Sequence, residues 1–346
     1  MRYSADALTR LAHDLLTDAG LEEDKARATS TYLVMADMMG HSTHGLALLP
    51  WYLGHIREGI VAKDGAPEVI ADKAAAIAWN GRRLPGAWLT EQAVLTATER
   101  AKTTGTATVS IANSHHNGAL ATYLHLATDQ GMLVSVASSS PSGQQVAPFG
   151  GLRGIFTPNP VAWGIPTPTD PILIDISASI TTANMCARMV REGRDYDRDW
   201  LMDEAGNPTN DPKVIGNGGS LLPTGGLDHG QKGYGMALSI EALTQGLAGY
   251  GRADSPKGTN CATTVTVYDP EAFGGTDAFL RQTGWLTNAC LTNPPRDPAQ
   301  PVRLPGQAAQ ARMSKAKTDG VSLYTGIFDA LATEANARNI PLPAAL

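Results

Sequence analysis

The chain of 346 residues has few cysteines, a low charge density and no long apolar run. Its three cysteines, Cys186, Cys261 and Cys290, are widely spaced and form no Cys-x-x-Cys pair, which argues against a disulfide framework and against a zinc site. No stretch of about 18 apolar residues could span a membrane. The net charge is −6, so no basic surface for nucleic acid is expected. These absences leave a small molecule as the expected partner.

The first 24 residues lack the apolar segment of a secretory signal. Asp6, Arg10, Asp14 and Asp18 interrupt them at short intervals, whereas such a signal needs an uninterrupted apolar core. Together with the low cysteine content, this pattern predicts a cytoplasmic protein in a reducing compartment.

The usual nucleotide-binding signatures are also missing. No Gly-x-Gly-x-x-Gly occurs at a strand–helix junction, and no Gly-x-x-x-x-Gly-Lys-Ser/Thr occurs at all, so neither an ordinary Rossmann site nor a P-loop is supported. A different glycine-rich stretch, Gly225–Gly235, contains Lys232 and Gly233. Its glycines allow backbone amides to approach a phosphate or a nicotinamide. The alternative interpretation is a flexible turn with a solvated lysine.

The periodicity of apolar residues predicts an alternating α/β chain. Ser4 can cap a first helix, in which apolar residues recur from Leu8 to Leu16 and which Gly20 ends. Further helices are predicted at 22–39, 46–57, 90–101 (capped by Thr90), 118–128, 236–247 and 320–339. Strands are predicted at 68–71, 75–79, 106–112, 132–137, 172–176 and 263–268, and a long loop at 138–160.

Two short loops hold four of the eight histidines. His41 and His44 follow the second helix, and His115 and His116 follow the strand at 106–112. The pKa of an ordinary histidine, about 6.5, suits proton transfer near neutral pH. We expect the two loops to face each other across a small-molecule site, with capping or core histidines as the alternative. No metal site is predicted, because adjacent histidines rarely ligate one ion.

Asp175 ends a short apolar strand pattern, Ile172–Ile176. A carboxylate there can accept hydrogen bonds from a ribose or orient a histidine. The alternative is a helix cap or a turn residue, since aspartate is common in both.

Taken together, several stretches resemble the type-2 malate/L-lactate dehydrogenase family, which includes ureidoglycolate and sulfolactate dehydrogenases and piperideine/pyrroline-2-carboxylate reductases. Each stretch is weak alone, but their order and spacing cover nearly the whole chain. The matching segments are Gly40–Gly45 with Leu49–Tyr52, Asn113–Ala119, Asn159–Pro166, Asp175–Ser179, Gly206–Pro212, Leu222–Pro223 with Lys232–Gly235, and Leu304–Gly306.

The resemblance implies an α/β protein with a non-Rossmann NAD(P)-binding fold and a helical N- and C-terminal dimerisation region, working as a homodimer. On this basis residues 1–120, packed with 291–346, contribute His44 and His116, and residues 121–290 form the cofactor-binding domain. The implied cofactor is NAD or NADP, with no preference indicated.

The resemblance also implies site residues. The histidine matching His116 is the proton acceptor in the family, with His44 in the active site and Thr43 as a hydrogen-bonding partner. The implied cofactor contacts are Ser140, Asp175, Ile176, Ser177, Lys232 and Gly233. Leu48 and Tyr52 are assigned to the substrate pocket.

This sequence departs from the family pattern at three places. Leu48 replaces an arginine that would clamp a substrate carboxylate, Asn184-Met185 replaces a Gly-Lys pair, and Asp228–Gln231 lengthens the loop before Lys232. The sequence therefore predicts an NAD(P)-dependent oxidoreductase that acts on a C=O or C=N carbon in an altered pocket. A cyclic imine reductase and a non-catalytic dimeric binding protein of the same fold are the alternatives.

Overall fold

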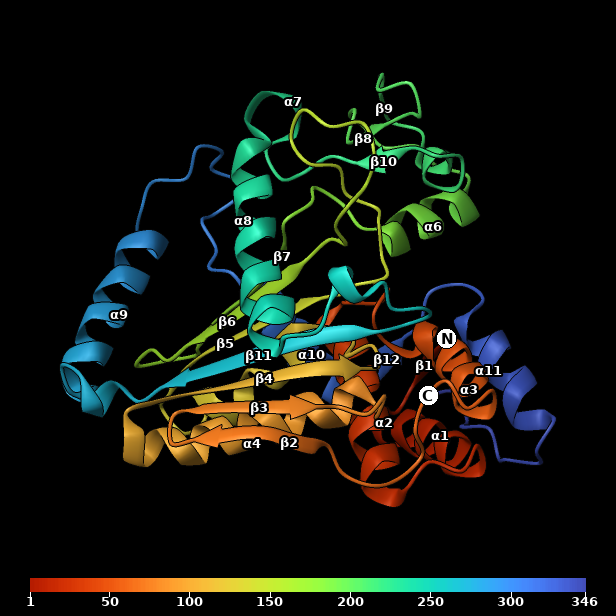
Figure 1. The fold of residues 1–346 in the computed structure, drawn as a ribbon, viewed down its shortest axis with the longest axis horizontal. Coiled ribbons are helices and arrows are strands. Elements are labelled where there is room, and N and C mark those ends of the chain that lie inside the picture. The colour runs from red at the N-terminus through yellow and green to blue at the C-terminus, as the bar shows by residue number, and fades with distance from the viewer.

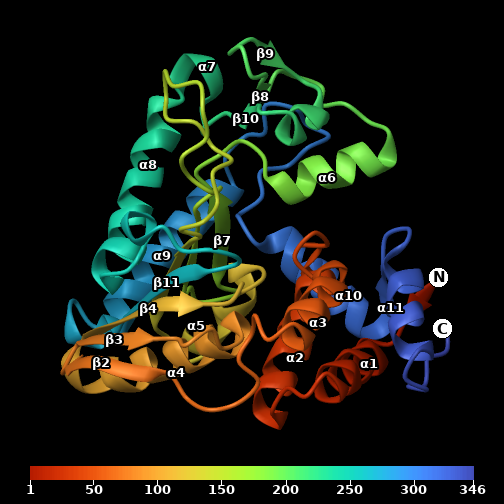
Figure 2. The same cartoon turned by 45° about the vertical axis from the view of Figure 1, so that its right-hand side comes forward.

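The computed structural model describes residues 1–346. Three parts are visible: a central sheet, a bundle of N- and C-terminal helices beside it, and a smaller upper lobe (Figures 1 and 2). The helices are α1 (Ala5–Asp18), α2 (Glu23–Met39), α3 (Leu49–Arg57), α4 (Gly86–Thr104), α5 (His125–Thr128), α6 (Ala183–Glu192), α7 (Gly226–His229), α8 (Gln231–Glu241), α9 (Thr276–Leu291), α10 (Gln307–Asp319) and α11 (Ile327–Asn336). The strands are β1 (Arg2–Tyr3), β2 (Glu68–Lys73), β3 (Ala76–Asn80), β4 (Thr106–Ser114), β5 (Leu133–Ser139), β6 (Pro160–Ile165), β7 (Ile172–Ser177), β8 (Leu201–Met202), β9 (Pro208–Thr209), β10 (Ser220–Leu221), β11 (Cys261–Tyr268) and β12 (Val321–Ser322).

The central sheet has seven strands in the order β2-β3-β4-β11-β5-β6-β7. Only β3 and β4 pair in parallel, and the other neighbours are antiparallel. Cys261 at the start of β11 is opposite Ser114 and the adjacent Ala262 is opposite Ser139. Pro160 at the start of β6 is opposite Ser177. The carboxyl ends of β4, β5 and β7 therefore lie at one edge of the sheet, and the segments that follow them meet there.

Two large apolar cores hold this arrangement. One lies between α4 and the sheet, with Leu89, Val109 and Ile111 at its centre. The other joins α1, α2, α3 and α11. Burying one leucine contributes about 2 kcal/mol, so each core stabilises its part of the chain strongly.

The apolar spacing of the first helix predicted its buried face correctly. Leu8, Leu11, Ala12, Leu15 and Leu16 are all buried, and Ser4 caps the helix through a hydrogen bond from the Ala7 backbone N–H. The helix predicted at 22–39 and the strands at 68–71, 75–79, 106–112, 132–137, 172–176 and 263–268 are also confirmed within a few residues.

Several predicted helix starts were wrong. The segments predicted at 46–57 and 118–128 each begin with a 3₁₀ helix, at Leu46–Leu48 and Leu120–Tyr123, before α3 and α5. Thr90 lies inside α4 and donates to the Gly86 carbonyl oxygen at 2.7 Å, because the helix already begins after Pro85. Helix α8 begins at Gln231, so Lys232 lies in its first turn and not in a flexible one. The last helix begins at Ile327, because Val321 and Ser322 pair with β1.

No helix of the structure combines the length and the apolar character needed to cross a membrane.

Candidate active site

The two histidine loops meet beside the sheet edge at which β4 ends. The rings of His44 and His116 lie 5.9 Å apart between centroids and are inclined by 22°. His44 comes from the turn between α2 and a 3₁₀ helix at Leu46–Leu48, and His116 comes from the segment after β4. Both side chains are half-buried. The two loops therefore face each other in the structure, as we expected from the sequence.

Asp37 fixes the first loop from beneath. Its Oδ2 accepts a hydrogen bond of 2.7 Å from the backbone N–H of Leu46, which satisfies a donor at the start of the 3₁₀ helix. Gly45 lies directly against the carboxyl group, where a Cβ atom would collide with it. Burial raises the pKa of Asp37 to about 7, and the Leu46 hydrogen bond opposes this shift.

The ring of His116 is oriented through its Nδ1 atom. The hydroxyl of Tyr52 lies 2.7 Å from Nδ1, and the backbone N–H of Gly118 donates to the same atom at 3.2 Å. Because a backbone N–H can only donate, Nδ1 carries a lone pair and the neutral ring keeps its proton on Nε2. His116 therefore presents a hydrogen-bond donor on the side away from Tyr52.

Both histidines are held in the neutral form. Burial lowers the pKa of His44 to about 4, and the nearby His41 adds to the effect. Burial also lowers the pKa of His116 to about 3, with the charge of His44 as the second cause. Thr43 Oγ1 lies 2.9 Å from His44 Nδ1 and holds that ring in place. Near neutral pH the site thus contains two neutral, oriented imidazoles.

His115 has a different environment from its neighbour. It is buried and lies 3.0 Å from His55, between Nε2 of His115 and Nδ1 of His55. Burial lowers its pKa well below the usual value, followed by the charges of His116, His55 and Arg83. No group of three or more His, Cys, Asp or Glu side chains is arranged to hold a metal ion. His115 therefore supports the loop from inside.

Asp175 and Ser177 lie on β7, on the second side of the site. Asp175 Oδ2 accepts the backbone N–H of Ala121 at 2.9 Å, and burial raises its pKa against the opposing effect of His41. The carbonyl oxygen of Ser177 accepts the Thr224 hydroxyl at 3.0 Å. Asp175 and Ser177 thus each bond a residue about 50 positions away along the chain.

Thr224 also joins this strand to the glycine-rich stretch. Its carbonyl oxygen accepts the backbone N–H of Gly233 at 3.0 Å. Gly233 packs on Thr224 and Ala178 so closely that no Cβ atom would fit. Lys232, next to it, is exposed and makes no hydrogen bond or ion pair, and the side chain of Ile176 is also largely exposed. Lys232 is therefore free to reach an anionic ligand.

Ser140 begins the loop after β5, and a buried polar network holds it. Its backbone N–H donates to Thr157 Oγ1 at 3.1 Å, and that hydroxyl donates to Asn159 Oδ1 at 2.8 Å. Asn159 in turn donates to Glu241 on α8 at 2.9 Å. Glu241 forms an ion pair of 2.8 Å with Arg252.

Arg252 closes this network onto the Ser140 loop. Its Nη1 donates to the carbonyl oxygens of Pro141 and Gly143, at 3.2 and 2.5 Å. Sequence reasoning missed Arg252 and Glu241, because both lie about 100 residues from the loop and belong to no motif. The predicted long loop at 138–160, the implied contact at Ser140 and the match around Asn159 indicated a functional segment, but not the residues that hold it.

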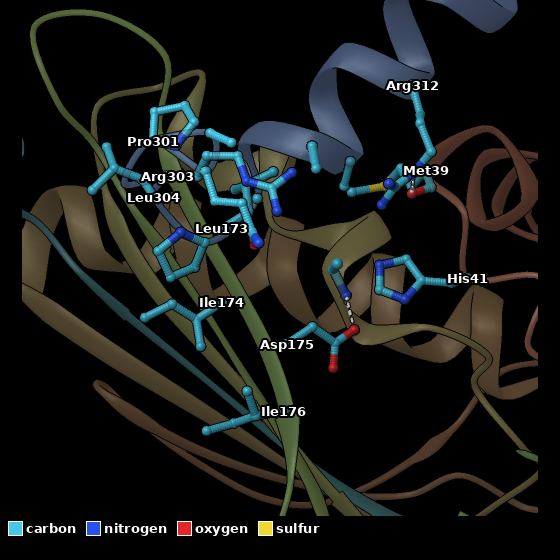
Figure 3. A pocket seen from close by; sticks show the side chains of 17 residues that line it. Met39, His41, Leu173, Ile174, Asp175, Ile176, Pro301, Arg303, Leu304 and Arg312 are labelled. Atoms are coloured by element: carbon cyan, nitrogen blue, oxygen red, sulfur yellow. Dashed lines mark hydrogen bonds between the residues drawn. The ribbon is translucent and has the colours of Figure 1, made fainter. Parts of the chain in front are cut away.

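A cavity of about 910 Å³ opens between β7, the end of α2 and the segment before α10. Asp175 and Ile176 line one wall and His41 the other, while Arg303 and Arg312 lie above them (Figure 3). This volume is within the range of small-molecule sites. Two arginines beside an apolar wall suit a nicotinamide cofactor, which carries phosphates and a flat ring, so the residues present fit such a group.

The two predicted substrate-pocket residues lie differently. Tyr52 points at His116, as described above. Leu48 is 9% exposed and packs in the apolar core of the N-terminal helices. It does not line the large cavity. Leu48 therefore supplies no polar group in place of the arginine that the family pattern has at this position.

Sequence comparisons give consistent matches along the chain. A model of the malate/L-lactate dehydrogenase family matches residues 3–332. The chain is 28% identical over 340 residues to a malate dehydrogenase of Pyrococcus horikoshii, covering 96% of this chain and 94% of that protein. It is 30% identical over 339 residues to a (2R)-3-sulfolactate dehydrogenase (NADP(+)) of Chromohalobacter salexigens, covering 95% and 96%.

Solved structures share the fold. A malate dehydrogenase from Entamoeba histolytica superposes with a TM-score of 0.92 at 22% identity, covering 99% of both chains. A dehydrogenase from Sinorhizobium meliloti superposes with a TM-score of 0.87 at 30% identity, covering 96% of this chain and 98% of that one.

Proposed function

Because this chain belongs to the malate/L-lactate dehydrogenase family, we propose that it transfers a hydride between a nicotinamide cofactor and the C=O or C=N carbon of a small substrate. The observation that carries the proposal is the pair of neutral, oriented histidines 5.9 Å apart. A cavity large enough for a cofactor reaches the same loop at His41. When bound, NAD or NADP supplies or accepts the hydride. The protein binds and orients both molecules and moves the proton.

His116 is the proton-transfer residue in this proposal. During reduction, the substrate oxygen or nitrogen gains electron density and needs a proton from a positioned donor. The Nε2–H of His116 points away from Tyr52 and provides that donor. An anionic substrate beside the ring raises its low pKa and lets it enter the reaction protonated. In the reverse direction, Nε2 accepts the proton of the alcohol or amine while the ring proton lies on Nδ1, where the Tyr52 hydroxyl accepts its hydrogen bond.

Tyr52 allows both proton arrangements of His116. In the ligand-free protein its hydroxyl donates to Nδ1. When Nδ1 is protonated, it donates to the hydroxyl, which in turn can donate to the His116 carbonyl oxygen 3.3 Å away, and the Gly118 N–H loses its acceptor. His44, fixed by Thr43, supplies a second neutral ring at the reacting centre. It orients the substrate through its free Nε2 atom.

Residues near the carboxyl ends of β5 and β7 are proposed to hold the cofactor, and of these Asp175 and Ile176 line the cavity. Ser140, the stretch Asp175–Ser177, Gly233 and Lys232 lie at or next to the sheet edge where β5 and β7 end. Lys232 would place a positive charge near the cofactor phosphates. In this scheme residues 121–290 act as a non-Rossmann cofactor-binding domain. Residues 1–120 and 291–346 supply the histidines and the helical dimerisation region.

Exposed apolar side chains within residues 121–290, outside the proposed helical dimerisation region, offer an additional association surface for a homodimer. Helix α9, which stands at the left edge of the molecule in Figure 1, has no buried residue. Trp285 and Phe273 are 69% and 67% exposed, and Leu247 after α8 is 57% exposed. Apolar patches of this kind mark association surfaces. The expected result is a dimeric mass by light scattering.

A cyclic imine reductase is the second candidate. The burial of Leu48 in the core removes the cation expected at that position, which favours a substrate other than malate or lactate. A non-catalytic dimeric binding protein is the third possibility that the experiment separates.

Cofactor binding and turnover test the proposal. NADH or NADPH should quench tryptophan fluorescence and raise the melting temperature, and a panel of 2-oxo acids and cyclic imines should then identify the substrate class. His116→Ala should lose at least about 100-fold in kcat, as expected for a lost acid–base group, and should keep its affinity for the cofactor. The absence of binding by either cofactor would overturn the proposal. Near-normal turnover of His116→Ala would overturn the role of that residue.

A further inference from the structure

One arginine reaches from the upper lobe to the loop that carries His44. Arg188 lies on α6, which faces the N- and C-terminal helices across the molecule (Figure 2). Its Nη1 donates to Ser42 Oγ at 3.1 Å, joining residues 146 positions apart. Ser42 is only two residues from His44. This contact therefore holds the Arg188 guanidinium group, which is ion-paired with Glu192, against the loop that carries His44.

Neighbouring groups hold the Arg188 side chain in place. Its Nε donates to Glu192 at 2.7 Å, one helical turn away. The guanidinium group lies over the ring of Tyr324, 4.9 Å from the ring centroid. The side chain remains 29% exposed, so solvent or a ligand can reach it. A preorganised arginine loses less conformational entropy when it binds a ligand.

Arg188 and Ser42 retain donors that the protein does not use. Arg188 Nη2 makes no hydrogen bond, although Nε and Nη1 both do. The Ser42 hydroxyl accepts from Arg188 and has no acceptor for its own hydrogen. A guanidinium N–H pair beside a hydroxyl can bind both oxygens of a carboxylate. The unused donors thus match an anionic group of that shape.

Other cations near the loop are less suitable. The Nε of Arg312 is already bonded to the Met39 carbonyl oxygen at 2.9 Å, and Arg303 lines the cavity assigned to the cofactor. Arg191, on the same helix as Arg188, donates to the Tyr324 hydroxyl at 3.1 Å and makes no contact with the histidine loop. Arg188 is therefore the cation that hydrogen-bonds a side chain of this loop, whereas Arg303 and Arg312 line the cavity assigned to the cofactor.

We propose that Arg188, together with Ser42, binds a carboxylate of the substrate and so determines specificity for 2-oxo or 2-imino acids. This inference rests on the proposed function of the same site. According to this inference, the substrate carries an anionic group even though position 48 is a leucine. The cation comes from α6 and not from the 3₁₀ helix at Leu46–Leu48.

Substitution of Arg188 tests the inference, with Arg191→Met as the matched control. Arg188→Met should raise KM for a 2-oxo acid by about 10- to 100-fold, the loss expected for a charge-assisted hydrogen bond. The KM for the corresponding 2-oxo amide and the affinity for NADH or NADPH should stay unchanged. Oxalate, titrated calorimetrically as a carboxylate probe, should bind more weakly by a similar factor. Arg188→Lys should recover part of the loss, and Arg191→Met should behave like the parent protein.

Two results would overturn the inference while leaving the proposed function intact. One is an unchanged KM for the acid in Arg188→Met. The other is an equal loss for acid and amide with a lower melting temperature, which would make Arg188 a structural link between α6 and the loop. If the parent protein binds neither cofactor, the proposed function fails and the inference fails with it.

Discussion

The hydroxyl oxygen of Tyr52 lies 2.7 Å from Nδ1 of His116 and 3.3 Å from the carbonyl oxygen of the same residue. One buried tyrosine on α3 therefore fixes the ring that is proposed to transfer the proton. The Gly118 backbone N–H, 3.2 Å from Nδ1, selects the tautomer with the proton on Nε2. Tyr52 of the helical bundle thus orients the ring of His116, which lies in the loop after β4.

This relationship predicts the protonation state of His116. Burial lowers its pKa to about 3, so nitrogen NMR of the ligand-free protein at pH 6 to 7 should show a neutral ring with its proton on Nε2. Tyr52→Phe should lower kcat by about 3- to 10-fold, the effect of one hydrogen bond, without changing cofactor affinity. Tyr268→Phe, whose hydroxyl has no partner, is the control. A doubly protonated ring at pH 6 would contradict the assignment.

Much of the site could be predicted because its signals are local. The apolar periodicity predicts a strand at 106–112 that ends before His115 and His116. It also predicts a helix at 22–39 that ends before His41 and His44. The periodicity and the predicted element ends were therefore enough to place both histidine loops directly after a strand or a helix. Their mutual approach was expected from the four histidines that they share, but neither period nor termination could establish it. The chain order carries no information on which strand ends share an edge, and antiparallel pairing through β11 decides this.

The residues that hold the loops were harder to predict. Asp37 occupies an ordinary helical position in an apolar segment, and nothing in the spacing indicates that its carboxyl group bonds the Leu46 backbone. Arg252 contacts a loop 109 to 111 residues away. Such contacts depend on tertiary packing. Leu48, by contrast, is buried in the core together with its apolar neighbours.

Asp37 leads to a prediction about the pH dependence of stability. Its pKa is about 7 in the folded protein, compared with an ordinary value of 3.8. The unfolded chain therefore releases this proton first, and the stability that the neutral carboxyl group provides is lost as pH rises from about 4 through 7. Asp37→Asn keeps an oxygen acceptor for Leu46 and cannot ionise.

Urea unfolding at pH 5 and pH 8 measures this effect. Relative to the parent protein, Asp37→Asn should gain about 2 kcal/mol of unfolding free energy between the two pH values. Both proteins retain His44 and His116, so the titration of the histidines cancels in the difference. The exposed Asp64→Asn should show no such change. A constant difference between Asp37→Asn and the parent protein at the two pH values would refute the raised pKa.

We expect Arg252 to be a positioning residue for the cofactor, because it bonds the loop that contains Ser140. Arg252→Met removes two hydrogen bonds to loop carbonyls and leaves Glu241 without its ionic partner. The unfolding free energy should fall by about 2 kcal/mol, since hydrogen bonds to charged groups are lost. The dissociation constant of NADH or NADPH should rise about tenfold, while kcat at saturating cofactor changes little.

Arg252→Lys should restore part of the affinity, because it keeps the charge but not the forked geometry. Arg198→Met, which removes an exposed arginine without partners, should leave both quantities unchanged. If Arg252→Met lowers stability but binds cofactor normally, the network supports the fold alone and Ser140 does not depend on it.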